Sequence, residues 1–242
     1  MENMHARLWM LNEKTIKMNN ILIIAPHADD EVLGCGATMA KLAKQGHNVY
    51  VLVATNASIG APELFSPELI CQIRSEALEA HNMLGVKDTT FLEFPAPALD
   101  QYPRYKMASE MASVIKKYSI DTVFIPHRGD CHIDHKIIHE CAMVACRPLA
   151  NSTVKEVCAY ETLSETEWGV PVSSDFFIPT KYVTFSEEEF GIKLKAMSCF
   201  KSQLYAFPAS RSLEAIEALA KYRGATVNKM RAESFEVLRV ID

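Results

Sequence analysis

The sequence of 242 residues lacks the features of a membrane protein or a secreted protein. Its most apolar run, Ile21–Pro26, ends at His27, whereas a membrane-spanning helix needs about 20 apolar residues. Residues 1–20 have neither the apolar core nor the small-residue cleavage site of a secretory signal. The seven cysteines form no Cys-x-x-Cys pair, and their odd number argues against a disulfide framework. We therefore expect a reduced, cytoplasmic protein with no membrane span.

Basic charge and chain-breaking residues are also scarce. The chain carries 25 Lys and Arg against 30 Asp and Glu, a net charge of −5, so it lacks the basic excess of a nucleic-acid-binding protein. It has only 9 glycines and 11 prolines, which favours regular helices and strands over long irregular segments. We expect no nucleic-acid partner, and one domain over residues 21–242 preceded by an N-terminal arm at residues 1–20.

Strands and helices are predicted to alternate along the chain. Short apolar runs with β-branched residues are typical of strands buried on both faces, and apolar residues spaced three and four apart predict helices. This alternation predicts βαβ units, and hence an α/β protein with a doubly wound, mostly parallel sheet and helices on both faces. A loop is expected over residues 57–67. The predicted strands are 21–25, 48–55, 90–94, 121–126, 154–160, 181–185 and 234–240, and the predicted helices are 31–45, 68–84, 103–118, 134–146, 186–200 and 212–222.

Two polar clusters follow two of these strands. Pro-His-Ala-Asp-Asp-Glu occupies residues 26–31, and His-Arg-Gly-Asp-Cys-His-Ile-Asp-His occupies residues 127–135. Ligands of doubly wound sheets bind beyond the carboxyl ends of the strands. The two clusters should therefore face each other across one crevice.

The residue types in the clusters suit a metal ion. Imidazole nitrogens and carboxylate oxygens bind Zn²⁺, and such a site would also accept Fe²⁺ or Co²⁺. Pairs spaced three apart, His27 with Asp30 and His132 with His135, lie on one side of a turn. The adjacent Asp29 and Asp30 point in different directions, so one can bind the metal while the other faces the bound water.

At these motifs the sequence resembles the LmbE-like (PIG-L) family of zinc-dependent N-acetylglucosamine deacetylases. Residues 26–31 match the usual family form Pro-His-Pro-Asp-Asp-Glu, with Ala28 in place of the central Pro, and Val-Leu-Gly-Cys-Gly-Ala-Thr follows. Residues 130–135 match the second family motif, His-x-Asp-His after an Asp two residues earlier. The resemblance covers the chain after residue 20. Less specific matches are Glu76–Ala77, Leu84–Gly85, Lys201–Gln203 and Arg223–Gly224.

The resemblance implies a Rossmann-like three-layer fold and a hydrolase with one Zn²⁺ per chain. Such an enzyme removes an acetyl group from an N-acetylated amino sugar or its conjugate, by attack of zinc-bound water on the amide. The implied partner is that small molecule, and because relatives are often oligomeric, a homo-oligomer is also implied. By motif position the metal ligands would be His27, Asp30 and His135, the general base Asp29, and the acid or oxyanion partner His132, hydrogen-bonded to Asp134.

Substrate contacts are less well marked. The family usually has an Arg three residues before the helix Glu, where this chain has Ile73, with Arg74 one residue closer. Arg74, Arg128 and Asp130 are the candidate contacts, although for Arg128 a solvated loop is an equal alternative. The loop after the second strand is expected to shape the substrate pocket.

Two other functions remain open from the sequence. One is an amidase of the same family that acts on a different acyl group or on a thiol conjugate. The other is a non-catalytic sugar-binding or nucleotide-binding protein, against which Asp29 and His132 count, because a pure binder needs neither a base nor an acid. Gly34-Cys35-Gly36 is interpreted as close helix–sheet packing rather than a dinucleotide site, because position 39 is Met.

Overall fold

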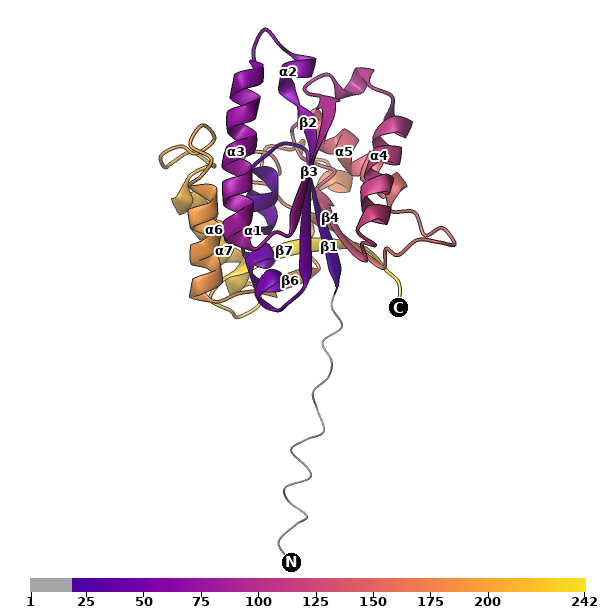
Figure 1. Ribbon diagram of the computed structural model, residues 1–242. Coiled ribbons are helices and arrows are strands. Elements are labelled where there is room, and N and C mark those ends of the chain that lie inside the picture. Colours follow the sequence, from indigo (N-terminus) through magenta and orange to yellow (C-terminus); the bar gives the residue numbers. More distant parts are fainter. Residues whose placement is uncertain (1–18) are drawn as a thin grey trace, which may run out of the picture.

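One sheet of seven strands with helices on both faces makes up residues 19–242, the part that the structure, a computed structural model, describes (Figure 1). Residues 1–18, and with them most of the predicted N-terminal arm, lie outside the described residues. The strands are β1 (Asn20–Ala25), β2 (Asn48–Asn56), β3 (Asp88–Pro95), β4 (Thr122–Pro126), β5 (Glu156–Tyr160), β6 (Lys181–Thr184) and β7 (Ala232–Val240). The helices are α1 (Asp30–Lys44), α2 (Ala57–Gly60), α3 (Pro67–Leu84), α4 (Arg104–Lys117), α5 (Ile133–Ala145), α6 (Glu187–Met197) and α7 (Leu213–Ala225), with short helical turns η1 (Leu99–Gln101) and η2 (Ser173–Asp175).

The strand order across the sheet is β3-β2-β1-β4-β5-β7-β6. Strands β1 to β5 pair in parallel, and β7 pairs antiparallel with both β5 and β6. The prediction of an α/β protein with a mostly parallel sheet is confirmed, and each predicted strand and helix is present within a few residues of its expected bounds.

The segment 57–67 differs from the expected loop, because its first residues form α2, a single helical turn. Asn56 caps this turn, since its Oδ1 accepts bonds from the backbone N–H (3.0 Å) and the hydroxyl (2.7 Å) of Ser58. Asn is a preferred residue at this position of a helix. One turn is too short to produce a hydrophobic period, so the sequence pattern misses it.

Both faces of the sheet are buried, as the continuous apolar runs predict. In β1, Ile21 and Ile23 face one core, while Leu22 and Ile24 face the other. Residues of α1, α3, α6 and α7 line the first core, and residues of α4 and α5 line the second.

Helix α1 packs very closely on strand β5 at Gly34 and on helix α6 at Gly36. A Cβ atom at Gly34 would lie 2.2 Å from Cδ2 of Tyr160, and one at Gly36 would lie 2.8 Å from Cγ of Lys193. The interpretation as helix–sheet packing is confirmed for Gly34, where a side chain would overlap the ring of Tyr160, whereas Gly36 lies against Lys193 of α6 instead of the sheet.

A buried ion pair is hydrogen-bonded to the backbone of α1. Lys193 of α6 donates to Glu233 of β7 (2.6 Å) and to the carbonyl of Leu33 (2.7 Å). The Glu233 carboxylate accepts from the backbone N–H groups of Ala37 (3.0 Å) and Thr38 (2.7 Å). The helix that follows the first polar cluster is therefore held by residues from the C-terminal third of the chain.

None of the helices between residues 19 and 242 has the length and hydropathy of a membrane span. The seven cysteines are free thiols, of which Cys35 is among the five that are buried, while Cys71 and Cys131 are exposed.

Candidate metal centre

The two polar clusters meet at the carboxyl ends of β1 and β4, which are neighbours in the sheet. The first cluster links β1 to the N-terminus of α1, and the second links β4 to the N-terminus of α5. The expectation that the clusters face each other is confirmed by the ring centroids of His27 and His135, which are 5.4 Å apart.

His27, Asp30 and His135 form a group that could hold a metal ion. Their ligand atoms all lie within 4.8 Å of one another. Oδ2 of Asp30 is 3.3 Å from Nδ1 of His27 and 3.2 Å from Nε2 of His135. Nε2 of His135 and Oδ1 of Asp30 are buried without a hydrogen-bond partner. Because buried polar atoms in proteins are nearly always paired, these residues fit a cation bound between them.

The electrostatics of the group favour positive charge. Burial by itself lowers the pKa of His27, but hydrogen bonds to Asp134 and Asp30 raise it to about 9. Burial likewise opposes protonation of His135, but Asp30 and Asp130 hold its pKa well above the usual value. The carboxylates therefore stabilise a positive charge at this point, which a bound cation would supply.

Asp130 supports the group from behind rather than from the substrate side. Its Oδ2 is 2.8 Å from Nδ1 of His135, and its Oδ1 accepts a bond from Thr166 (2.6 Å). The side chain is completely buried. Asp130 does not line the cavity described below, so its contacts fit an orientation of the His135 ring, and its role as a substrate contact stays a prediction.

Asp29 and Asp30 diverge because of the backbone at Asp29, which has a φ of 137°. Few residues other than glycine adopt such a φ, and strain of this kind is common at functional sites. Glu31 stabilises this backbone conformation, because one of its carboxylate oxygens accepts a hydrogen bond from the N–H of Asp29 (3.2 Å). The other oxygen of Glu31 is 2.8 Å from Nε2 of His81. Burial and the neighbouring Asp30 raise the pKa of Asp29 to about 8, against the opposing charge of Arg211.

His132 lies beside this group at the start of α5. Its Nδ1 accepts from the backbone N–H of Asp134 (3.1 Å), so the imidazole caps the helix. The expected side-chain hydrogen bond between Asp134 and His132 is absent, since Oδ2 of Asp134 is 3.8 Å from Nδ1 of His132 but 3.1 Å from Nε2 of His27. The physical reason is that the backbone N–H already occupies Nδ1 of His132. His27, His132 and Asp134 also form a second, more exposed group that could hold a metal.

A cavity of about 360 Å³ opens beside the candidate metal group. Its polar lining includes both candidate acid–base residues, and its remaining lining is largely apolar. The lining residues are His27, Ala28, Asp29, Val53, Thr55, Ala57, Phe65, Ile70, Ile73, Arg74, Ala96, Pro97, His132, Asp134, Glu165, Gln203 and Arg211.

Arg211 is the principal site residue that the sequence did not reveal. Its guanidinium donates to Oδ2 of Asp29 (3.1 Å) and to Gln203 (3.0 Å), and it lies 3.5 Å from Glu165. Glu165 in turn accepts from the backbone N–H of His132 (3.1 Å). The cluster ties both polar motifs to the segment between α6 and α7, where only the less specific match at Lys201–Gln203 gave a signal.

The two arginines predicted as substrate contacts lie in different places. Arg74 lines the cavity, but its Nη1 donates to Glu93 (2.8 Å) and its Nη2 to the carbonyl of Leu92 (3.2 Å). Arg128 does not line it: the side chain is exposed and bonds to the carbonyl of Ser174. The chain turns after β4 and directs Arg128 toward η2, which fits the alternative of a solvated loop better than a substrate contact.

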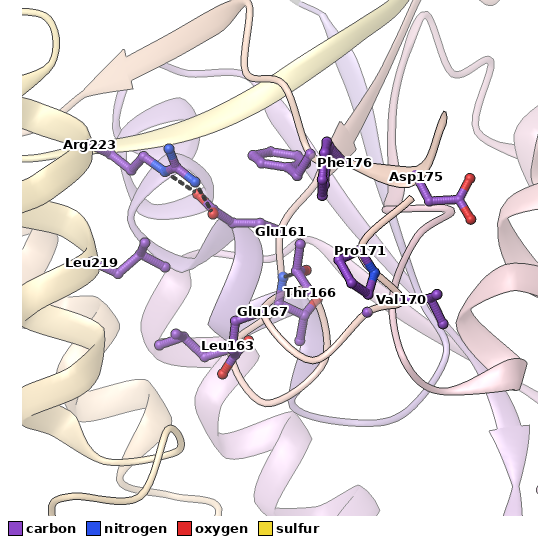
Figure 2. Close-up of a pocket in the computed structure, with 13 residues that line it drawn as sticks. Glu161, Leu163, Thr166, Glu167, Val170, Pro171, Asp175, Phe176, Leu219 and Arg223 are labelled. Atoms are coloured by element: carbon purple, nitrogen blue, oxygen red, sulfur yellow. Dashed lines mark hydrogen bonds and ion pairs between the residues drawn. The ribbon is translucent and has the colours of Figure 1, made fainter. Parts of the chain in front are cut away.

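A second cavity of about 370 Å³ lies next to the segment between β5 and β6 (Figure 2). Figure 2 shows Arg223 and Glu161 facing each other on its wall, and Arg223 donates two bonds to Glu161, of 2.8 and 2.6 Å. None of its lining residues belongs to the candidate metal group. This ion pair gives the Arg223–Gly224 match a structural role.

Comparisons with known proteins agree with the motifs. The family model of PIG-L, described as GlcNAc-PI de-N-acetylase, matches residues 22–146, more than half of the chain. An uncharacterized deacetylase of Escherichia coli, YaiS, is 31% identical over 191 residues, which cover 77% of this chain and 92% of that protein. The diacetylchitobiose deacetylase of Thermococcus kodakarensis is 32% identical over 133 residues, covering 52% of this chain and 48% of that protein.

Solved structures show the same fold at lower identity. The N,N'-diacetylchitobiose deacetylase from Pyrococcus horikoshii has a TM-score of 0.74 at 22% identity, with 92% of this chain and 85% of that chain covered. The 4-carboxy-2-hydroxymuconate hydratase of Pseudomonas putida has a TM-score of 0.72 at 18% identity, with 93% and 99% covered. Deacetylases and a hydratase thus share this architecture, so the fold alone does not identify the reaction.

Proposed function

The chain belongs to the PIG-L family of de-N-acetylases, and on that basis we propose that it removes the acetyl group from an N-acetylated amino sugar or its conjugate. The observation that carries this proposal is the group of half-buried His27 with buried Asp30 and His135, beside Asp29 at the cavity wall. The deacetylase relatives support the same reaction class.

We propose that His27, Asp30 and His135 hold one Zn²⁺, for which Fe²⁺ or Co²⁺ could substitute. A metal bound there lowers the pKa of water to about 7 and polarises the amide carbonyl. Asp130 keeps Nε2 of His135 directed at the site through its bond to Nδ1 (2.8 Å).

The residues that line the cavity carry out the proton transfers in this proposal. Asp29 accepts a proton from the attacking water, and Arg211 holds its carboxylate in place through the 3.1 Å bond. His132 donates a hydrogen bond to the amide oxygen as negative charge develops there. The C–N bond then breaks, Asp29 passes its proton to the leaving nitrogen, and a free amine and acetic acid result, the acid losing its remaining proton to solvent as acetate.

The proposal extends to the architecture of the chain. Helices on both faces of a mostly parallel sheet support the Rossmann-like three-layer description. The pairing of β7 with β5, and the packing of α6 and α7 on the same core as α1, support one domain over residues 21–242.

Amine release from methyl β-N-acetylglucosaminide tests the function. We expect the purified chain to release the amine, and to lose this activity after chelation. Added zinc should restore the activity as the measured metal content rises to about one per chain. Persistent activity after complete metal removal would contradict the metal-dependent mechanism. No release from any N-acyl amino sugar by the zinc-loaded chain would contradict the function itself.

A further inference from the structure

The cavity beside the candidate metal group has two walls of different chemistry. The polar wall follows the carboxyl ends of β1 and β4 and includes Asp29, His132 and Arg211. The apolar wall comes from β2, from α2 and the segment after it, from the first turns of α3 and from the turn after β3. Figure 1 shows α2 and the start of α3 at the same end of the molecule. Its apolar residues are Val53, Ala57, Phe65, Ile70, Ile73, Ala96 and Pro97.

The cations that line the cavity already have carboxylate partners. Arg74 pairs with Glu93 at 2.8 Å, and its guanidinium lies over the ring of Phe91, 4.9 Å from the centroid. Arg211 pairs with Asp29 at 3.1 Å and with Glu165 at 3.5 Å. An acidic group on a substrate would have to displace one of these carboxylates before it could be neutralised. The cavity therefore disfavours negatively charged substituents.

The apolar wall is held in shape without a ligand. Gly60 touches the turn after β3, since a Cβ atom there would lie 2.0 Å from the carbonyl oxygen of Ala96. Asn56 caps α2 and also donates to Glu93 (2.5 Å). Ser66 caps α3 by accepting from the N–H of Leu69 (3.2 Å). A surface that is fixed in advance does not lose further conformational entropy when a ligand packs on it.

We propose that the substrate is an N-acyl amino sugar with an uncharged apolar group, which packs against Phe65, Ile70 and Ile73. This inference rests on the proposed function and specifies its substrate class. The apolar group could belong to the acyl chain or to the aglycone. In either case an alkyl group would contact the apolar wall. Each methylene that leaves water contributes about a fourfold gain in binding, so a short alkyl group gives a measurable preference.

Four substrates separate the two sources and test the charge argument. These are the methyl and hexyl β-glycosides of N-acetylglucosamine, a hexyl glycoside that ends in a carboxylate, and the methyl glycoside of N-butyrylglucosamine. We expect kcat/KM for either the hexyl glycoside or the N-butyryl compound to exceed that for the methyl N-acetyl compound by at least ~10-fold. The carboxylate-ended glycoside should lose most of any gain that the hexyl group gives.

Two variants of α3 show whether the wall is responsible. In Ile73→Thr the preference for the favoured alkyl substrate over the methyl N-acetyl compound should fall toward one. Leu78→Thr is the matched control, because Leu78 lies on the same helix, is 50% exposed and does not line the cavity. Leu78→Thr should keep the kcat/KM of the unchanged chain for both the alkyl substrate and the methyl N-acetyl compound.

The outcomes distinguish this inference from the function on which it rests. No turnover of any of the four compounds by the zinc-loaded chain would contradict both the inference and the proposed function. Turnover of the methyl N-acetyl compound with no alkyl preference, or with the carboxylate-ended glycoside preferred, would refute the inference and leave the function standing. Calorimetry with the methyl and hexyl glycosides of glucosamine measures binding without turnover. Equal affinities for these two compounds, together with no gain in kcat/KM for the N-butyryl compound, would also refute the inference.

Discussion

The neighbouring carboxylates Asp29 and Asp30 have different roles in the proposed mechanism, and the variants Asp29→Asn and Asp30→Asn separate them. Both side chains are buried and chemically identical, but Asp30 bridges His27 and His135, whereas Asp29 lies in the cavity lining. Each substitution keeps the size of the side chain and replaces a carboxyl group that can ionise with a neutral amide.

The expected loss for Asp29→Asn follows from its contacts. Arg211 retains its bonds to Gln203 (3.0 Å) and Ser164 (2.6 Å), so the cluster around it should persist. Removal of one of two adjacent buried carboxylates also relieves repulsion with Asp30. We therefore expect a folded protein with normal metal content and KM, and a kcat lower by roughly 10²–10⁴, the usual contribution of a positioned general base.

Asp30→Asn should give the opposite pattern. The amide supplies no negative charge between His27 and His135, so metal affinity should fall first and activity should follow metal occupancy, recovering in part at high zinc. The assay is elemental analysis together with steady-state amine release for both variants. Glu93→Gln is the control, because this carboxylate pairs with Arg74 at the cavity edge and lies outside the metal group. Loss of metal in Asp29→Asn would show that the two assignments are reversed, and full activity in both variants would refute the mechanism.

Three further predictions concern neighbouring residues. His132→Ala should lower turnover by roughly 10²–10⁴ with metal content retained, and a metal-free variant would instead make His132 a ligand. Asp130→Asn should weaken metal affinity by about 10–100-fold, because His135 loses the carboxylate at its Nδ1; competition with a chelator measures this, and an unchanged affinity would contradict the role of Asp130. Lys193→Met should lower the free energy of unfolding by about 3–5 kcal/mol, because it leaves the buried Glu233 without its cation; urea unfolding that shows a change below ~1 kcal/mol would show that the pair does not stabilise α1.

Much of the fold could be predicted from the sequence because its signals are local. A run such as Ile21–Ala25 reports a strand buried on both faces, and both faces are indeed covered. The position of the site also follows from local information, since residues at the carboxyl ends of parallel strands gather at one edge of the sheet. The meeting of His27 with His135 needed only that β1 and β4 be neighbours.

The remaining features depend on tertiary contacts that no short pattern encodes. Arg211 is 182 positions from Asp29, and nothing beside it in the sequence marks it as a site residue. The side-chain partner of Asp134 could not be predicted either. The backbone N–H of Asp134 at the start of α5 donates to Nδ1 of His132, and the carboxylate of Asp134 therefore pairs with His27 instead. Arg128 is adjacent to a motif in sequence, yet the turn after β4 directs it away from the cavity.

The bonds from Glu233 to the backbone of α1 have a consequence for biosynthesis. Residues 26–31 leave the ribosome early, but the carboxylate that accepts from Ala37 is 196 positions further along the chain. Domains generally fold as units during synthesis, and here the helix behind the first motif gains its last contacts only when β7 has been made. A growing chain thus displays its histidines and aspartates before their supports exist. We therefore expect tight metal loading to belong to the completed polypeptide, and a fragment that stops at residue 146 to bind zinc weakly.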